Sequence, residues 1–320
     1  MPQIDEPGLF RNYAKISPET TGETLADLDR TAIIDLYKQH GALLFRGFPL
    51  DTGIFRELTG AWCTHAVIND SRGRKVVDAE NAIQTVNTGE AAFPLHPELA
   101  REPWKPDICF FACLQPPQKG GETTICDGTA IVRKLPRAAL AALDGRRLRY
   151  SKPATPEELE YWLGSADPDA ETLRHPPADC PFEFFDVDGS IVRSFTRPAL
   201  HRTMFSDTPC FGNFLLFARY QNKLRHFPVF EDGSEIPDAL VARIKRASDR
   251  VTVPVKWRAG DLLMLDNTRF MHGRRPIRNV EERSIITYFG FLDFAMPSPD
   301  EGPSPRWRDP AVWRSVRANI

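Results

Sequence analysis

Apolar residues in the first third of the chain switch between helical and strand spacing. They recur at helical spacing in DLDRTAIIDLYKQHG, where Asp29 is placed to cap the start of the helix and Gly41 to end it. ALLFRGF follows as a strand, and DTGIFRELTGAW predicts a second short helix that begins at Asp51 or Thr52. Two helices flanking one strand are therefore expected before residue 63.

Strand patterns dominate the rest of the chain. DICFFACLQPP is apolar on both faces, as in a buried central strand, and FEFFDVDGSIVRSF predicts a hairpin around Asp188-Gly189. VTVPVKW alternates with period two, and GGETTICDG, FGNFLLFARY, DLLMLDN and SIITYFGFLDF are further expected strands. TAIVRKLPRAALAALDG predicts one or two short helices and IPDALVARIKRASDR a longer one. The fold class expected is mainly β with flanking helices, built on a barrel or jelly-roll core.

No linker or repeat divides the sequence, so residues 1–320 are expected to form a single domain. Residues 151–181 are rich in Pro, Asp, Glu and Ala and are interpreted as a lid or an insertion. Residues 296–320 begin Pro-rich and then carry two tryptophans, which predicts a strap across the surface.

Composition narrows the classes of function. Hydrophobic residues make up 42% and charged residues 26% of the chain, and the formal net charge is −2, so neither nucleic acid nor an anionic membrane surface is favoured as a partner. The start lacks the pattern of a secretory signal, and no stretch reaches the roughly 20 apolar residues of a membrane helix. A cytoplasmic protein without disulfides is expected, because the six cysteines show no C-x-x-C spacing.

A candidate metal site comes from three residues. In FPLHPELAREP, His96 and Glu98 stand two positions apart, and in an extended strand both side chains would project from one face. A His-x-Glu alone is more often a solvated loop pair. His272 in LDNTRFMHGRRP lies between two expected late strands, so it can meet the earlier pair at the mouth of a barrel. Two histidines and one carboxylate on one face of a metal are the ligand set of non-haem Fe(II) oxygenases.

At this point the chain resembles the TauD/TfdA family of Fe(II)- and 2-oxoglutarate-dependent dioxygenases, especially its SyrP-like and clavaminate-synthase-like members. The likeness runs in order through GALLFRGFPL, LHPE, CLQPPQKGGETT, RPAL and GDLLMLDNTRFMHGRRP to FLDF. It implies a double-stranded β-helix fold, the jelly roll also found in cupins. It also implies that His96, Glu98 and His272 bind Fe(II), that Arg283 pairs with the distal carboxylate of 2-oxoglutarate, and that the hydroxyl of Thr123 reaches the same carboxylate.

Two departures from the commonest family pattern bear on the substrate. Glu98 stands where Asp is usual, which is similar to several amino-acid hydroxylases. The taurine enzymes use a second arginine for the sulfonate, and here that position is Thr287. The related halogenases lack a carboxylate ligand, so Glu98 argues against that chemistry.

Other polar residues near these motifs are candidates for the substrate. Asn87 in TVNTGE lies just before the metal-bearing strand, and Arg197 in FTRPAL either anchors a substrate carboxylate or makes a salt bridge. His65 either reaches the substrate or is an ordinary hydrogen-bonded histidine. Arg275 and Arg278 are interpreted as charges of a solvated loop.

The expected activity is hydroxylation of an unactivated C–H bond of an amino acid or similar small polar metabolite, in secondary metabolism, coupled to decarboxylation of 2-oxoglutarate to succinate and CO2 with O2 as oxidant. The substrate is either free or presented on a carrier protein. The protein is either a monomer or a homo-oligomer. Alternatives are a sulfonate or other small acid as substrate, desaturation as the outcome, or a jelly-roll binding protein without catalysis. Nucleic-acid demethylation is disfavoured by the lack of a broad basic surface.

Overall fold

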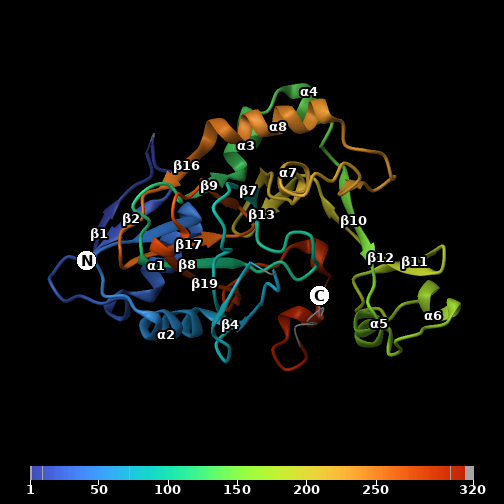
Figure 1. Ribbon diagram of the computed structural model, residues 1–320, viewed down its shortest axis with the longest axis horizontal. Coiled ribbons are helices and arrows are strands. Elements are labelled where there is room, and N and C mark those ends of the chain that lie inside the picture. The colour runs from blue at the N-terminus through green and yellow to red at the C-terminus, as the bar shows by residue number, and fades with distance from the viewer. Residues whose placement is uncertain (1, 9, 72, 303, 314–320) are drawn as a thin grey trace.

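The computed structural model describes residues 2–8, 10–71, 73–302 and 304–313. It is mainly β with flanking helices, as expected, and Figure 1 shows its elements. The N-terminus lies beside the main sheet, and the last described residues lie between that sheet and a β-rich arm (Figure 1).

The main sheet has nine strands in the order β1-β2-β3-β17-β8-β19-β6-β5, with β4 also paired to β19. These strands are β1 (Gln3–Asp5), β2 (Ala14–Ser17), β3 (Ala42–Phe45), β4 (Cys63–Ala66), β5 (Val76–Asp78), β6 (Ile83–Thr85), β8 (Ile108–Gln115), β17 (Asp261–Asp266) and β19 (Ser284–Leu292). A second sheet has the order β16-β9-β18-β7, formed by β16 (Thr252–Val255), β9 (Thr123–Asp127), β18 (Phe270–Arg274) and β7 (Phe93–His96).

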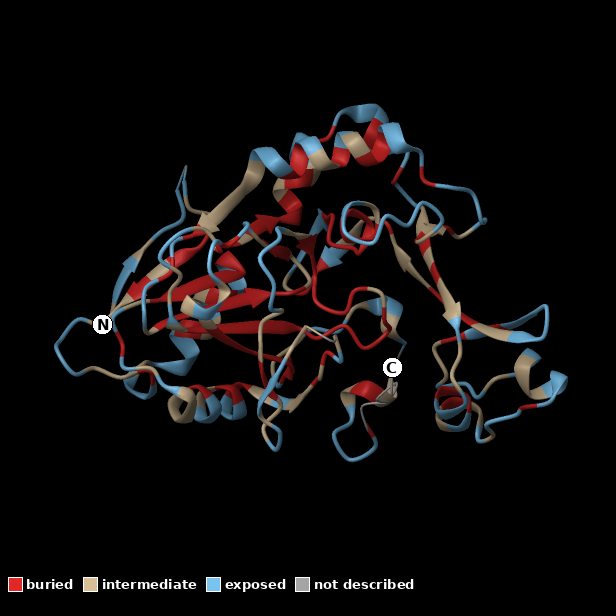
Figure 2. Ribbon diagram, viewed as in Figure 1, coloured by how far each residue is buried: buried red, intermediate tan, exposed pale blue. Residues whose placement is uncertain are grey.

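The two sheets pack face to face around one hydrophobic core. Alternate residues of central strand β8 point to opposite sides: Cys109 and Phe111 join a cluster with Ile125 and Phe270 of the second sheet. Ile108, Phe110 and Ala112 instead join the cluster on the other face of the main sheet, which contains residues of helices α1 (Arg30–His40) and α2 (Thr52–Trp62). The central strands β3, β8, β17 and β19 are accordingly buried along most of their length (Figure 2). This is the jelly-roll arrangement expected from the sequence.

A further four-stranded sheet forms the arm, in the order β11-β12-β10-β15. Its strands are β10 (Arg147–Pro153), β11 (Glu183–Val187), β12 (Ser190–Pro198) and β15 (Val229–Phe230), and it carries α5 (Pro156–Leu163) and α6 (Ala170–Arg174) at its far end (Figure 1). The hairpin expected around Asp188-Gly189 is thus confirmed, with β11 paired to β12. Residues 151–181 belong to this arm.

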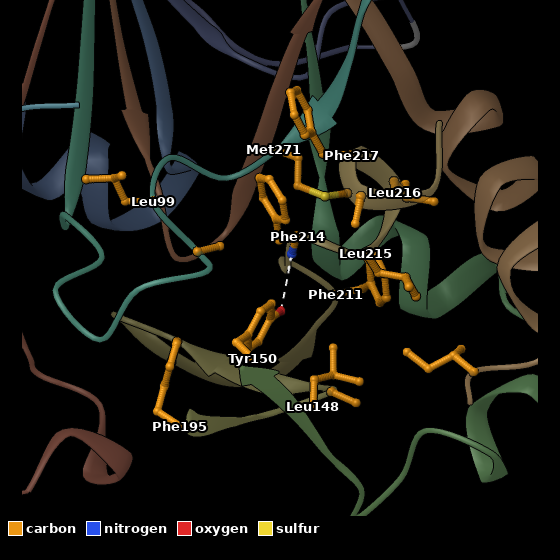
Figure 3. Packing of buried hydrophobic residues seen from close by; sticks show 14 of the residues in the cluster. Leu99, Leu148, Tyr150, Phe195, Phe211, Phe214, Leu215, Leu216, Phe217 and Met271 are labelled. Atoms are coloured by element: carbon orange, nitrogen blue, oxygen red, sulfur yellow. Dashed lines mark hydrogen bonds between the residues drawn. The ribbon is translucent and has the colours of Figure 1, made fainter. Parts of the chain in front are cut away.

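The remaining helices lie beside the second sheet. They are α3 (Gly128–Lys134), α4 (Arg137–Ala141), α7 (Leu215–Tyr220) and α8 (Asp238–Val251), with a small sheet of β13 (His201–Thr203) and β14 (Ser206–Cys210) beside them. Helices α4 and α8 run across the top of the view (Figure 1). Figure 3 shows how α7 and its approach join the core: Phe211 and Phe214 lie toward Tyr150 and Leu148 of β10, and Phe217 lies toward Met271 of β18. Short 3-10 turns occupy Leu25–Asp27, Val280–Glu282, Pro299–Glu301 and Arg306–Arg308.

Local signals specify the first helices. The Asp29 carboxylate accepts hydrogen bonds from the backbone N–H groups of Thr31 and Ala32, and Gly41 ends α1 in the left-handed conformation with φ of 68°. Asp51 caps α2 through the backbone N–H of Ile54. Both helices expected before residue 63 are confirmed.

The strand expected in FGNFLLFARY is wrong, because the segment forms helix α7. Its apolar residues Phe214 to Phe217 are buried on all sides, so the pattern carries no period that separates a strand from a helix. The Asn213 side chain accepts a hydrogen bond from the backbone N–H of Leu215 at 3.0 Å, which favours a helical turn at that point.

The C-terminal segment lies across the surface as far as it is described. The Arg306 guanidinium is paired with Asp179 of the arm, and the Trp307 carbonyl faces the His65 ring 2.8 Å away. Residues 314–320 of the expected strap lie outside the described residues. None of the helices in the described part of the chain has both the length and the apolar character needed to cross a bilayer.

Candidate metal and 2-oxoglutarate site

His96 and His272 face each other from adjacent strands. His96 ends β7 and is paired with His272 of β18 in the antiparallel register, and each residue is only 6% exposed. The Nδ1 atom of His96 lies 2.9 Å from the Pro94 carbonyl oxygen, so Nδ1 carries the proton and Nε2 is left as a ligand. Burial lowers the pKa of both imidazoles, which keeps them neutral, the form that coordinates metals.

Glu98 meets the two histidines, although it does not share a strand with His96. Strand β7 stops at His96 and Glu98 lies in the following turn, so the expectation of one extended strand is wrong. Asn267 holds this turn: its side chain accepts from the Glu98 backbone N–H at 2.7 Å and donates to the Glu98 carbonyl at 3.0 Å. The side chain of Asn267 replaces the strand partner that the turn lacks.

The Glu98 carboxylate is 1% exposed and both of its oxygens are occupied. Oε1 accepts a hydrogen bond from the Asn69 amide, and Oε2 accepts one from Nη2 of Arg74 at 3.0 Å. Oε2 also lies 3.7 Å from Nε2 of His272. Sequence reasoning missed Asn69, Arg74 and Asn267, because residues 29, 24 and 169 positions away carry no local signal of this contact.

The three side chains form a donor set that fits Fe(II). One ligand atom of each of His96, Glu98 and His272 lies within 4.8 Å of the other two, and all three residues are buried. Two imidazole nitrogens and one carboxylate oxygen are the set used by non-haem Fe(II) oxygenases. The rings of Phe111 and Phe217 lie 5.1 and 4.8 Å from His272 and His96, so the site has an apolar wall that limits access of water.

Arg283 and Thr123 line the same small cavity as the two histidines. Arg283 directly precedes β19 and Thr123 begins β9. Nη2 of Arg283 is 3.4 Å from the Thr123 hydroxyl, and Nε of Arg283 is buried without a hydrogen-bond partner. Burial, together with the nearby positive charge of Arg274, lowers the pKa of Arg283 to about 10. A buried guanidinium with no acidic partner among the described residues is suited to binding a carboxylate.

Trp257 orients the Thr123 hydroxyl. Its indole Nε1–H donates to Thr123 Oγ1 at 3.0 Å. Because this oxygen then accepts from the indole and faces Arg283, the hydroxyl hydrogen is left to be donated to a ligand. The sequence predicts Trp257 only as part of a half-buried strand and carries no signal of this role.

Asn87 also lines the cavity, beside Arg274. The Asn87 side-chain oxygen accepts from the Ser71 hydroxyl at 3.1 Å. Arg274 donates to the backbone carbonyls of Asn87 and Ala91, at 2.5 and 3.0 Å, so its guanidinium fastens the loop that precedes β7.

Arg197 and His65 are not among the residues that line this cavity. Nη2 of Arg197 donates to the carbonyls of Glu102 and Pro103, at 2.7 and 2.9 Å, and so holds the loop that follows Glu98. Nε2 of His65 lies 2.8 Å from the Trp307 carbonyl oxygen. The Thr287 hydroxyl donates to the Phe110 carbonyl within the main sheet. No residue of 151–181 is among the described residues that line the cavity.

The remaining expectations concern the loop charges and the cysteines. Arg275 and Arg278 are exposed, as expected for a solvated loop. All six cysteines are free thiols.

Comparisons with known proteins agree with this geometry. A model of the family described as "Taurine catabolism dioxygenase TauD, TfdA family" matches residues 10–287. The chain belongs to this family. It is therefore an Fe(II)- and 2-oxoglutarate-dependent dioxygenase, which requires Fe(II), 2-oxoglutarate and O2, and the expected enzyme class and cofactors are confirmed.

Two curated relatives cover most of the chain. The chain is 25% identical to the dapdiamide synthesis protein DdaC of Enterobacter agglomerans, over 85% of this chain and 88% of that protein. It is 23% identical to a clavaminate synthase-like protein of Arabidopsis thaliana, over 75% and 79% of the two chains.

Solved structures share the fold at lower identity. A taurine dioxygenase from Burkholderia xenovorans matches with a TM-score of 0.61 and 14% identity, over 94% of this chain and 92% of that one. PvcB, an Fe, alpha-ketoglutarate dependent oxygenase from an isonitrile synthetic pathway, matches with a TM-score of 0.57 and 15% identity, over 93% and 94%. At this identity the likeness concerns the fold, and the jelly-roll core is confirmed.

Proposed function

We propose that the enzyme hydroxylates an unactivated C–H bond of an amino acid or a similar small polar metabolite, free or bound to a carrier protein. His96, Glu98 and His272 would hold Fe(II), and Arg283 with Thr123 would bind the distal carboxylate of 2-oxoglutarate. The observation that carries the proposal is Arg283: its buried guanidinium has no anionic partner among the described residues and lines the same cavity as both histidines.

Each residue would have a separate task. The Pro94 carbonyl keeps the proton of His96 on Nδ1, so that Nε2 faces the metal position. Asn69 holds one oxygen of Glu98 and leaves the other oxygen toward His272. Arg283 and Thr123 would fix the far end of the cosubstrate by charge and by a hydrogen bond. When bound, Fe(II) with 2-oxoglutarate and O2 supplies the oxidising power, yielding succinate, CO2 and one oxygen atom for the substrate.

The proposed substrate class rests on the two relatives and on the residues that line the cavity. DdaC is named as a dapdiamide synthesis protein and PvcB as an oxygenase from an isonitrile synthetic pathway, which favours secondary metabolism for this chain as well. Asn87 lines the cavity and remains the proposed polar contact for the substrate. Arg197 would take part only if the loop at Glu102 and Pro103 released it, since both of its observed bonds are to that loop.

The test is a substrate panel with the iron-loaded enzyme and 2-oxoglutarate. Taurine, free amino acids and aminoacyl carrier proteins are compared by succinate formation and by product mass. A gain of one oxygen on an amino-acid substrate, coupled to succinate, is the expected result. His96→Ala and His272→Ala are the matched inactive variants, because two remaining ligands do not hold the ion. Coupled turnover of taurine alone, or full activity in either variant, would contradict the proposal.

A further inference from the structure

Arg74 lines the cavity and contacts a proposed metal ligand directly. Its side chain is only 4% exposed, and Nη2 donates to Oε2 of Glu98 at 3.0 Å. Its other polar contacts are weak: Nη1 lies 3.4 Å from the Thr85 carbonyl, and Nε is buried without a hydrogen-bond partner. The guanidinium also stacks 4.8 Å from the centre of the Phe289 ring. Glu98 is therefore the main polar partner of Arg74.

The oxygen that Arg74 occupies is the one that a metal ion needs. Oε2 of Glu98 lies 3.7 Å from Nε2 of His272, so an ion held by both residues would bind Oε2. The other oxygen, Oε1, is held by the Asn69 amide, whose own oxygen accepts from the Ser71 backbone N–H at 2.9 Å. With Asn69 on Oε1, Arg74 and a divalent cation would both lie at Oε2, where their positive charges repel each other, so the two would compete for this oxygen.

The charge of the loaded cavity shows what a displaced Arg74 would bind. Arg74, Arg274 and Arg283 all line the cavity, and none of the described lining residues is acidic, with Glu98 directly behind. Three arginines and Fe(II) bring five positive charges, while Glu98 and 2-oxoglutarate bring three negative ones, so two positive charges remain. Arg274 is already tied to two backbone carbonyls. Arg74 is the cation left for a substrate anion.

We propose that metal binding displaces Arg74 from Glu98 and that the released guanidinium binds a carboxylate of the substrate. This inference rests on the proposed function of the triad. Arg74 lines the cavity directly beside the two histidines, so a guanidinium released from Glu98 stays within reach of the substrate. A free acid then fits the site better than a carrier thioester, because the thioester has no charged carboxylate at its acyl carbon.

Metal affinity tests the competition without any need for activity. Mn(II) is titrated calorimetrically into the metal-free wild-type protein, Arg74→Met and Arg74→Lys. Arg74→Met should bind Mn(II) roughly tenfold tighter, because the charge-assisted bond that the metal must break is gone, and Arg74→Lys should lie between the two. If Arg74 merely positioned Glu98 for the metal, its removal would weaken binding. Unchanged or weaker Mn(II) binding by Arg74→Met therefore overturns the inference.

Arg274→Met is the matched control. It removes the same charge from the same cavity but has no hydrogen bond to Glu98. Its gain in Mn(II) affinity should be clearly smaller than that of Arg74→Met, and an equal gain would refute competition for Glu98. Wild-type protein that binds no stoichiometric Mn(II) would instead refute the metal site itself. The two failures are thus distinguishable.

The substrate part is tested with whichever compound the panel identifies. That compound is compared with the derivative in which each carboxylate is a carboxamide. We expect the wild-type enzyme to lose at least roughly tenfold in kcat/KM with the carboxamide, and Arg74→Met to show no such preference. Equal use of acid and carboxamide by the wild-type enzyme, or an unchanged preference in Arg74→Met, would overturn the assignment.

Discussion

Replacing Arg283 by methionine should weaken binding of 2-oxoglutarate strongly while leaving the metal-free fold intact or more stable. Methionine keeps much of the length and packing of the side chain but removes its charge. In the free enzyme this guanidinium has a 3.4 Å contact to Thr123 and a buried, unpartnered Nε, so it gives up little when a carboxylate arrives. Nearly all of the free energy of the new charge-assisted pair would then contribute to the affinity for the cosubstrate.

The size of the effect follows from the two states of Arg283. Hydrogen bonds to charged groups contribute roughly 1.5–3 kcal/mol, so the variant should bind 2-oxoglutarate about 10- to 150-fold more weakly. In the absence of the cosubstrate, burial lowers the pKa of Arg283 to about 10, which means that the folded state disfavours its charged form by about 3 kcal/mol. Removing that charge should therefore not lower the free energy of unfolding of the apoprotein.

Two measurements and one control decide the matter. Anaerobic calorimetry of the Mn(II)-loaded protein gives the dissociation constant for 2-oxoglutarate, and urea denaturation of the apoprotein gives its stability. Arg278→Met is the control, because this exposed arginine lies in the same loop and should change neither quantity. Wild-type affinity in Arg283→Met would refute the reasoning. If Arg278→Met lost affinity instead, Arg278 would be the carboxylate anchor.

Two further predictions concern residues that support the site. Trp257→Phe removes the indole N–H that donates to Thr123, so 2-oxoglutarate should bind roughly fivefold more weakly. The affinity for Mn(II) should stay the same. A loss of Mn(II) affinity would indicate general damage to the fold. Arg193→Met leaves the buried carboxylates of Glu102 and Glu158 with Lys152 and the more distant Arg101 as counter-charges. Urea denaturation should show a loss of about 3–5 kcal/mol, against less than about 1 kcal/mol for the exposed pair in Arg225→Met. Equal losses in these two variants would show that the buried network is no stronger than a surface pair.

The parts of the fold predicted from the sequence are those specified by nearby residues. Asp29 and Gly41 bound α1 through contacts within a few positions, and β8 is buried on both faces in agreement with its unbroken apolar run. Helix α7 was not predicted, because a short segment that is buried on every side shows neither the helical nor the strand period of apolar residues. The pairing of the arm strand β10 with β15, which lies much later in the chain, could not be read from either strand alone.

The same distinction applies to the candidate site, where the residues with a sequence signal were predicted and their distant partners were not. His96, Glu98 and His272 were found because their side-chain types and their order along the chain are informative, and the fold brings one ligand atom of each within 4.8 Å of the others. The partners of Glu98 were not found. Asn69, Arg74 and Asn267 are ordinary polar residues in the sequence, and only the folded chain brings them to one carboxylate.

The arm matters to the site through the loop that follows Glu98. Glu102 is paired with Arg193 of β12, the Glu102 and Pro103 carbonyls are held by Arg197, and the Trp104 ring lies among Trp162 and Phe182 of the arm. Since β7 ends at His96, no strand pairing fixes this loop. The ion pairs and rings of the arm hold this loop where the bonds of Asn267 to the Glu98 backbone end, so a weakened arm would loosen the loop directly after Glu98. Residues of the arm would then control metal affinity without any of them lining the cavity.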